Sequence, residues 1–78
     1  MANKPYNGHK NWNHWNVSLW INNDEVLYNM ARAHVTLYRG KLPAAFNMVN
    51  ELHSAGLTHT PDGAPYSVSS VRAAMVDM

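Results

Sequence analysis

The three tryptophans of this 78-residue chain all lie in one short run, between Trp12 and Trp20, and this run constrains the fold more than any other feature. A chain of this length buries only about 60% of its unfolded surface, so its core is small. It has no cysteine, so no disulfide can compensate. Because tryptophan dominates both small cores and binding sites, the run anchors the fold, contacts a partner, or does both.

The charge and hydropathy of the chain exclude several classes of function. Six lysines and arginines against five acids give a net charge of +1 at pH 7. Strong nucleic-acid binders normally carry a basic stripe, whereas these cations are spread along the chain. No apolar run approaches the ~20 residues that span a bilayer, and the polar start lacks the hydrophobic segment of a signal peptide. We therefore expect a cytoplasmic protein that does not contact membranes.

The apolar patterning predicts an all-α fold, a small single-domain bundle of three to four short helices with an extended N-terminal arm. We expect the arm over residues 1–11, a tryptophan-rich segment plus a helix over 12–40, and a helix–loop–helix over 41–78. All of these belong to one domain, residues 1–78, because the chain is short and has no long linker.

Residues 12–21 fit two kinds of secondary structure. Apolar and polar residues alternate as in a strand, but Trp12, Trp15 and Leu19 also form one face of a helix that Asn11 or Asn13 can cap. We favour a short helix buried on nearly all sides, because no partner strand is evident elsewhere in the chain.

The clearest helix is predicted over residues 23–39. Asn22 and Glu25 have the spacing of a capping box, and Gly40 stands where a helix usually ends, at C′. Its predicted buried stripe consists of residues at the 3–4 spacing of an amphipathic helix: Leu27, Met30, Ala31, His34, Val35 and Tyr38.

Two more helices follow in the second half of the chain. Pro43 suits the first turn of a third helix, and Gly56 ends it. A turn-rich loop over residues 58–65 then leads to a final helix that Ser67 can cap. The predicted buried stripes are Ala45, Met48, Val49 and Leu52 in the third helix and Val68, Val71, Met75 and Met78 in the fourth.

Residue types that support catalysis are present without a recognised arrangement. None of the five histidines forms the i, i+4 pair that is typical of a zinc site on a helix. No P-loop, HExxH motif or nucleophile elbow occurs. We therefore expect no enzymatic activity, no metal site and no cofactor.

The asparagines among the tryptophans favour a binding surface, since rigid aromatic area beside adaptable amides is typical of one. The candidate partner contacts are Asn13, His14, Asn16, Trp20 and Tyr28. Within this set we expect Trp20, which is offset from the Trp12 and Trp15 face, to meet a partner. Trp12 and Trp15 are assigned to the core.

The second half of the chain resembles a known DNA-binding segment. Residues 45–57 (AFNMVNELHSAGL) and 60–72 (TPDGAPYSVSSVR) are similar to the helix–turn–helix-type segment of large serine recombinases. The resemblance implies that the last helix lies in a DNA groove, with Tyr66, Ser69, Ser70 and Arg72 facing the nucleic acid. The recombinase helices are richer in arginine, so the alternative is that this segment only joins two helices compactly.

The first half resembles a family of small proteins of phages, plasmids and other mobile elements. The string W..WNV.LWI.NDE.LY, met here from Trp12 to Tyr28, is its hallmark. The resemblance implies a non-catalytic protein that binds and blocks a macromolecule in the cytoplasm of a bacterial host. The expected partner is a host protein or complex, for example of a defence system such as CRISPR.

Two other functions stay open at this point. One is a small helix–turn–helix-like DNA-binding regulator that uses the last helix. The other is a virion or self-assembling structural protein, and a homodimer is compatible with any of the three functions.

Overall fold

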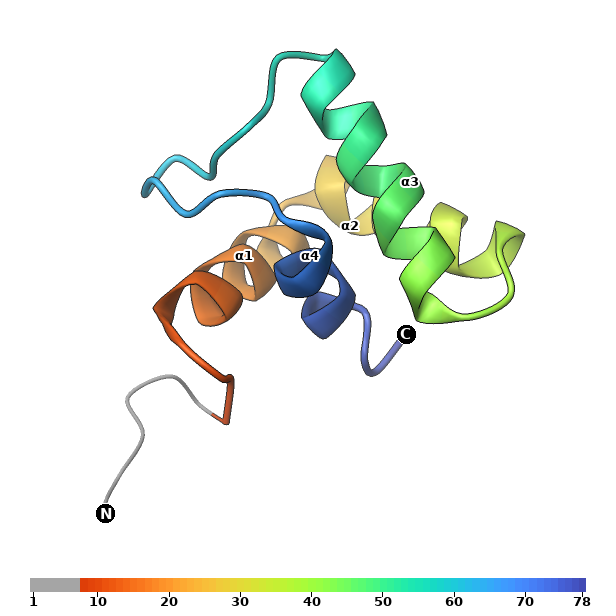
Figure 1. Cartoon of the computed structure of the whole chain (residues 1–78), viewed down its shortest axis with the longest axis horizontal. Coiled ribbons are helices and arrows are strands. Elements are labelled where there is room, and N and C mark those ends of the chain that lie inside the picture. The colour runs from red at the N-terminus through yellow and green to blue at the C-terminus, as the bar shows by residue number, and fades with distance from the viewer. Residues whose placement is uncertain (1–7) are drawn as a thin grey trace.

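The computed structural model describes residues 8–78, which fold into four helices with no strand among them (Figure 1). The predicted all-α bundle is confirmed. Residues 1–7, and with them most of the predicted arm, lie outside the described part of the chain. The helices are α1 (Trp12–Asn23), α2 (Glu25–Leu37), α3 (Lys41–Ser54) and α4 (Val68–Ala74).

The helices pack as a closed cycle, in which α1 contacts α2, α2 contacts α3, α3 contacts α4 and α4 returns to α1. Figure 1 shows α4 lying in front, with α1 on one side and α3 on the other. The shared core is almost entirely aliphatic, since Tyr66 is the only buried Phe, Trp or Tyr among residues 8–78. Its largest fully buried apolar side chains are Ile21, Met48, Leu52, Met75, Val17 and Val71.

Helix α1 confirms the preference for a helix over a strand at residues 12–21, but it turns a different face inward than we predicted. Asn11 caps it by accepting a hydrogen bond from the His14 N–H at 3.0 Å. The buried positions are Asn16, Val17 and Ile21. Leu19 is 39% exposed, so the prediction of burial on nearly all sides is wrong.

The break between α1 and α2 is a single residue, Asp24, in an extended conformation. Its backbone N–H donates to the Trp20 carbonyl, and its carboxylate accepts from the Leu27 N–H at 3.0 Å. A carboxylate at this N-cap also stabilises the positive end of the helix dipole. The predicted Asn22–Glu25 capping box is therefore wrong, because Asn22 still belongs to α1.

Gly40 was predicted to end the second helix, but it begins the third. Helix α2 already ends at Leu37, with Tyr38 as its C-cap, and Gly40 is the N-cap of α3 with φ at +90°. Only glycine takes this backbone conformation without strain. Pro43 lies in the first turn of α3, as predicted.

The end of α3 follows the prediction closely. Gly56 has φ at +83°. Its N–H donates to the His53 carbonyl at 3.0 Å, and the Leu57 N–H donates to the Leu52 carbonyl at 2.8 Å. These are the two hydrogen bonds of a Schellman motif, which satisfies carbonyls at a helix end.

The predicted buried stripes of the last three helices are largely confirmed. Leu27 and Ala31 of α2 are buried, and Met30, Val35 and Tyr38 pack against the core. The four residues predicted for α3 are all buried, as are Val71 and Met75 near the C-terminus, while Val68 and Met78 are partly buried.

Helix α4 is only seven residues long, and a complete capping box defines its start. The Ser67 hydroxyl accepts from the Ser70 N–H, and the Ser70 hydroxyl accepts from the Ser67 N–H, both at 3.1 Å. Isolated helices this short are not stable in water, so α4 depends on this cap and on packing.

We predict that Ser67→Ala lowers the free energy of unfolding by about 1 kcal/mol, the usual effect of losing an N-cap side chain. Urea unfolding followed by circular dichroism measures the change. Ser54→Ala, an exposed serine at the end of α3, is the matched control. A loss no greater than that of the control would contradict the assigned role of the cap.

Candidate functional site

A polar network fastens the long connection between α3 and α4 onto α1. The buried Asn16 side chain lies at its centre and donates from Nδ2 to Asp62 Oδ2 at 2.9 Å. Its Oδ1 accepts from the Thr60 hydroxyl, which itself accepts from the Ala64 N–H at 3.0 Å. Trp20 Nε1 also donates to Asp62 Oδ2, at 2.9 Å. The network thus holds the turn of the connection against one face of α1.

The Asp62 carboxylate is the charged member of this network. Hydrogen bonds from Asn16 and then Trp20 lower the pKa of Asp62, because they favour its ionised form, and desolvation opposes them. The native state therefore binds a proton at Asp62 less readily than the unfolded chain does.

This network revises the roles predicted for the tryptophans. Trp20 was expected to be free for a partner, yet it packs against the core and bonds to Asp62. Trp12 was assigned to the core, yet it is 38% exposed, and Trp15 is only half-buried. The orientation of α1 explains the exchange, because the bonds of Asn16 turn the Asn16, Val17 and Trp20 side inward.

A second set of contacts joins the first helix to the last one. His14 of α1 and Ser69 of α4 lie 2.8 Å apart, from Nε2 to Oγ. Partial burial lowers the pKa of His14, and the nearby charges of Lys10 and His9 lower it further. The lowered pKa favours the neutral form of His14, whose Nε2 lies at the seam between α1 and α4.

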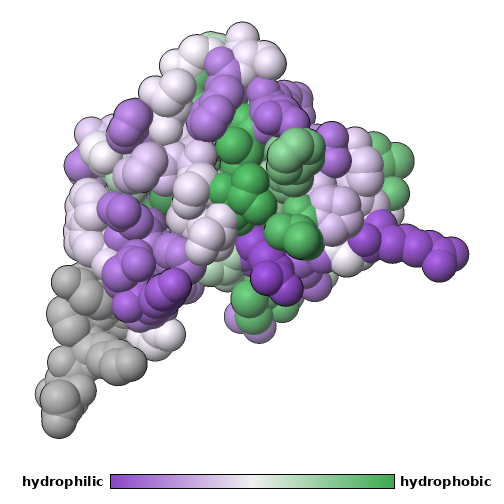
Figure 2. Space-filling model, in the orientation of Figure 1, coloured by the Kyte–Doolittle hydropathy of each residue, from purple (hydrophilic) through white to green (hydrophobic). Residues whose placement is uncertain are grey.

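A hollow of about 640 Å³ opens beside this seam. We call it the α3–α4 groove, because most of its lining comes from the start of α3 and from α4. Its lining combines cationic, hydroxyl and apolar side chains: His14, Lys41, Leu42, Val68, Ser69, Arg72, Ala73 and Val76. Figure 2 shows hydrophobic side chains gathered in the middle of the face that carries α3 and α4, with strongly hydrophilic ones beside them.

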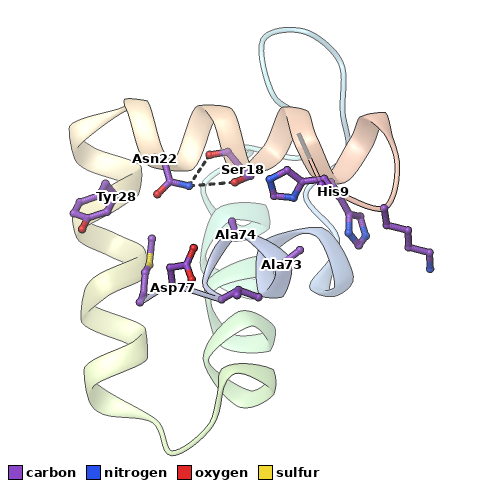
Figure 3. A pocket seen from close by; sticks show the side chains of 12 residues that line it. His9, Ser18, Asn22, Tyr28, Ala73, Ala74 and Asp77 are labelled. Carbon is purple, nitrogen blue, oxygen red and sulfur yellow. Dashed lines mark hydrogen bonds between the residues drawn. The ribbon is translucent and has the colours of Figure 1, made fainter. Parts of the chain in front are cut away.

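A neighbouring hollow of about 460 Å³ lies between α1 and the C-terminal turn (Figure 3). It shares His14, Ala73 and Val76 with the α3–α4 groove. Ser18 and Asn22 line its α1 side, where Asn22 Nδ2 donates to the Ser18 carbonyl at 2.9 Å. The two hollows therefore lie next to each other along α4.

The structure brings together residues from both predicted sets. His14 and Tyr28, predicted to contact a protein partner, line the smaller hollow, and His14 also meets Ser69 and Arg72 in the groove. Asn13 is exposed on α1, away from the lining of either hollow.

Three of the predicted contact residues have buried side chains. Asn16 is 1% exposed and belongs to the network with Asp62. Tyr66 is 4% exposed within the core, and Ser70 is fully buried in the capping box. Tyr66 also lines a separate hollow, together with Trp20 and Leu57.

Sequence reasoning missed Lys41, Leu42 and Val76, which complete the groove. Leu42 is 54% exposed and Val76 is 67% exposed, so both stand off the buried stripes of their segments. The one indication in the sequence was Leu42, an apolar residue outside the buried stripe and next to Lys41. Such an indication is weak when the packing of the helices is not known.

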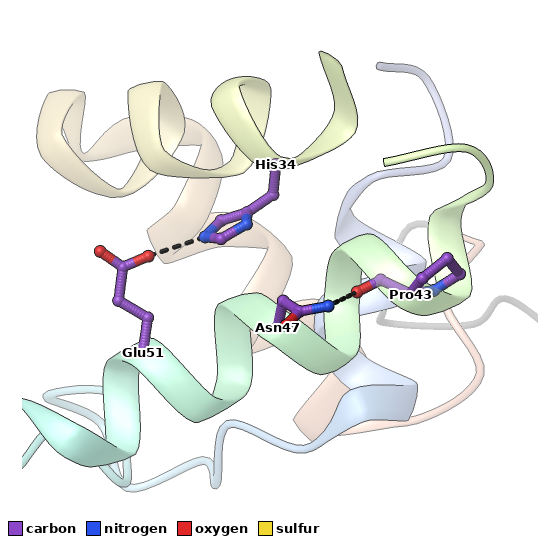
Figure 4. Close-up of polar contacts among 4 residues, drawn as sticks. All are labelled: His34, Pro43, Asn47 and Glu51. Carbon is purple, nitrogen blue, oxygen red and sulfur yellow. Dashed lines mark hydrogen bonds and ion pairs between the residues drawn. The ribbon is translucent and has the colours of Figure 1, made fainter. Parts of the chain in front are cut away.

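His34 forms a contact with Glu51 that joins two helices. His34 Nε2 of α2 lies 2.7 Å from Glu51 Oε1 of α3 (Figure 4). The His34 ring also stacks on Tyr38. The His34–Glu51 pair fastens α2 to α3 near their exposed edge. Within residues 8–78, no three histidine or acidic side chains come together as a metal site requires.

The chain belongs to DUF7249, a family of unknown function, which it matches over residues 2–78. No curated protein matches the chain, and no solved structure matches it either. None of the helices within residues 8–78 has the length and apolar character that a membrane span needs.

We predict that Asn16→Ala lowers the free energy of unfolding by about 2 kcal/mol, because it leaves a buried hydroxyl without its acceptor and removes a donor to a carboxylate. Urea unfolding measures the change. Asn13→Ala removes an exposed asparagine from the same helix and is expected to change stability by less than about 0.5 kcal/mol. Equal losses in the two variants would contradict the role of the network.

The lowered pKa of Asp62 predicts that the stability of the fold decreases at acidic pH. Because the folded pKa lies below the unfolded one, this contribution is complete above the unfolded value and is lost as the pH falls through the folded value. Thermal melts from pH 6 down to pH 2 should therefore show that Asp62→Asn removes part of the acid destabilisation seen in the unmodified chain. Asp77→Asn, at an exposed position, is the control. Parallel pH profiles for the Asp62→Asn and unmodified chains would overturn the assignment.

Proposed function

We propose that this chain is a non-catalytic accessory protein of a phage or other mobile element that binds a macromolecule of its bacterial host. Its mechanism is steric: a rigid helical surface covers a functional site on a host protein or protein complex in the cytoplasm. A component of a host defence system, such as a CRISPR complex, is the target class. The resemblance of the tryptophan-rich string to that of a mobile-element family supports this context.

The observation that carries the proposal is the α3–α4 groove. Leu42 and Val76 expose large apolar surfaces there, beside the cationic side chains of Lys41 and Arg72. Contiguous apolar surface with a polar rim is typical of a site for another macromolecule. The lining comes from α1, α3, α4 and the turn after α4. The His14–Ser69 contact and the Ser67–Ser70 capping box hold α4 in place, which preorganises the surface.

The fold favours a protein partner over DNA. Of the residues expected to face a nucleic acid, Tyr66 and Ser70 are buried, which leaves Ser69 and Arg72. Residues 55–67 connect α3 to α4, whereas a helix–turn–helix motif joins its helices by a turn of about 3–4 residues.

We predict that the immobilised chain retains a specific protein from a lysate of its bacterial host, and that Arg72→Ala weakens this binding about tenfold. The retained protein is identified, purified and titrated by calorimetry. Arg32→Ala is the matched control, because Arg32 is exposed on α2, away from the groove. Finding no host protein whose affinity distinguishes the two variants would contradict the proposal.

The same preparation separates the two other functions. A DNA-binding regulator would bind duplex DNA with an affinity that falls steeply with salt, because phosphate contacts release counterions. A virion or self-assembling protein would give a large mass in light scattering. Either result, without host-protein binding, would replace the proposal.

A further inference from the structure

We infer that the α3–α4 groove takes an acidic amphipathic segment of its partner, one that carries carboxylates beside large apolar side chains. This inference rests on the proposed function and specifies the chemistry of the partner. Two independent properties of the groove, its charge and its exposed apolar side chains, lead to it.

The charge of the groove has one sign. Lys41 at the start of α3 and Arg72 on α4 both line it, and none of its lining residues within 8–78 is acidic. Lys10 and His9 line the neighbouring hollow and lie near enough to His14 for their charges to lower its pKa. Asp77 is the one acidic residue that lines the smaller hollow, and it does not line the groove. Such a surface attracts carboxylates and repels a basic segment.

The apolar part of the groove requires more than a charged partner. Leu42 and Val76 are 54% and 67% exposed, and half-buried Val68, which packs against the core, also lines the groove. Phe46 is one turn beyond Leu42 on α3 and is 55% exposed. Burying these side chains needs apolar groups on the partner, spaced as on one face of a helix, which is the usual way that a helix occupies a groove.

These properties favour a protein segment over a nucleic-acid backbone. Phosphates satisfy cations but gain nothing from Leu42 or Val76. Arg72 is the only lysine or arginine on α4, and a single cation on the helix nearest to the ligand is a weak basis for phosphate binding.

The test uses the ¹⁵N-labelled chain and a synthetic helical peptide in which leucines at 3–4 spacing alternate with glutamates. Saturable chemical-shift changes are expected at Leu42, Ser69, Arg72 and Val76. A peptide with lysine in place of every glutamate should bind at least about tenfold more weakly, and so should one with serine in place of every leucine.

Variants of the chain test the two properties separately. Arg72→Glu should lower the affinity for the acidic peptide at least about tenfold, because it reverses a charge in the groove. Leu42→Ser should lower this affinity by removing apolar contact. Arg32→Glu makes the same charge change on α2 and should leave the affinity unchanged. Both changes in the groove are at exposed positions, so thermal melts should show that the variants stay folded.

Four results would overturn the inference: equal binding of the lysine peptide, shifts outside the groove, tighter binding of a 20-base-pair duplex, or shifts that depend only on the concentration of the chain. The last would show that a second copy occupies the groove. If the acidic peptide does not bind but a host protein still binds in an Arg72-dependent manner, the inference is wrong and the proposed function stands. Loss of both removes the proposed function as well.

Discussion

The hydrogen bonds of Asn16 are the interaction on which the rest of the structure depends. Residues 55–67 form little regular structure, and Thr60 and Asp62 attach them to α1 through the Asn16 amide, with the Trp20 indole as a second donor to Asp62. The attachment brings the chain back across α1, so that α4 packs there. A helix of seven residues has no stability of its own. Since α4 forms one wall of the α3–α4 groove, the candidate site depends on a buried contact that is not part of it.

The features that were predicted correctly are local ones. Ser67 caps a helix, Gly56 ends one and Pro43 begins one because each acts on its own backbone or on residues within one turn. Their effects do not depend on how the helices pack, so the sequence near each residue contains the information that is needed.

Two predictions failed locally, because Asp24 caps α2 in place of Asn22 and Gly40 begins α3 instead of ending α2. The other predictions that failed depended on distant partners. Asn16 resembled a partner contact because it stands among tryptophans, but its carboxylate partner lies 46 positions away. That pairing decides which side of α1 faces the core, and hence that Trp12 is exposed while Trp20 is not. The groove was half predicted for the same reason: His14, Ser69 and Arg72 were named in separate sets, and nothing local shows that they meet or that Lys41 joins them.

The residues that line the groove are far apart in the sequence, from His14 to Val76. Its seam, His14 against Ser69, joins positions 55 residues apart, so the surface exists only when α1 and α4 are both in place. A ligand that bridges them binds the folded state alone and raises its population by mass action. For a domain with so small an aliphatic core, the bound partner would stabilise the fold as well as occupy its surface. The affinity for the partner and the stability of the fold would then be thermodynamically linked.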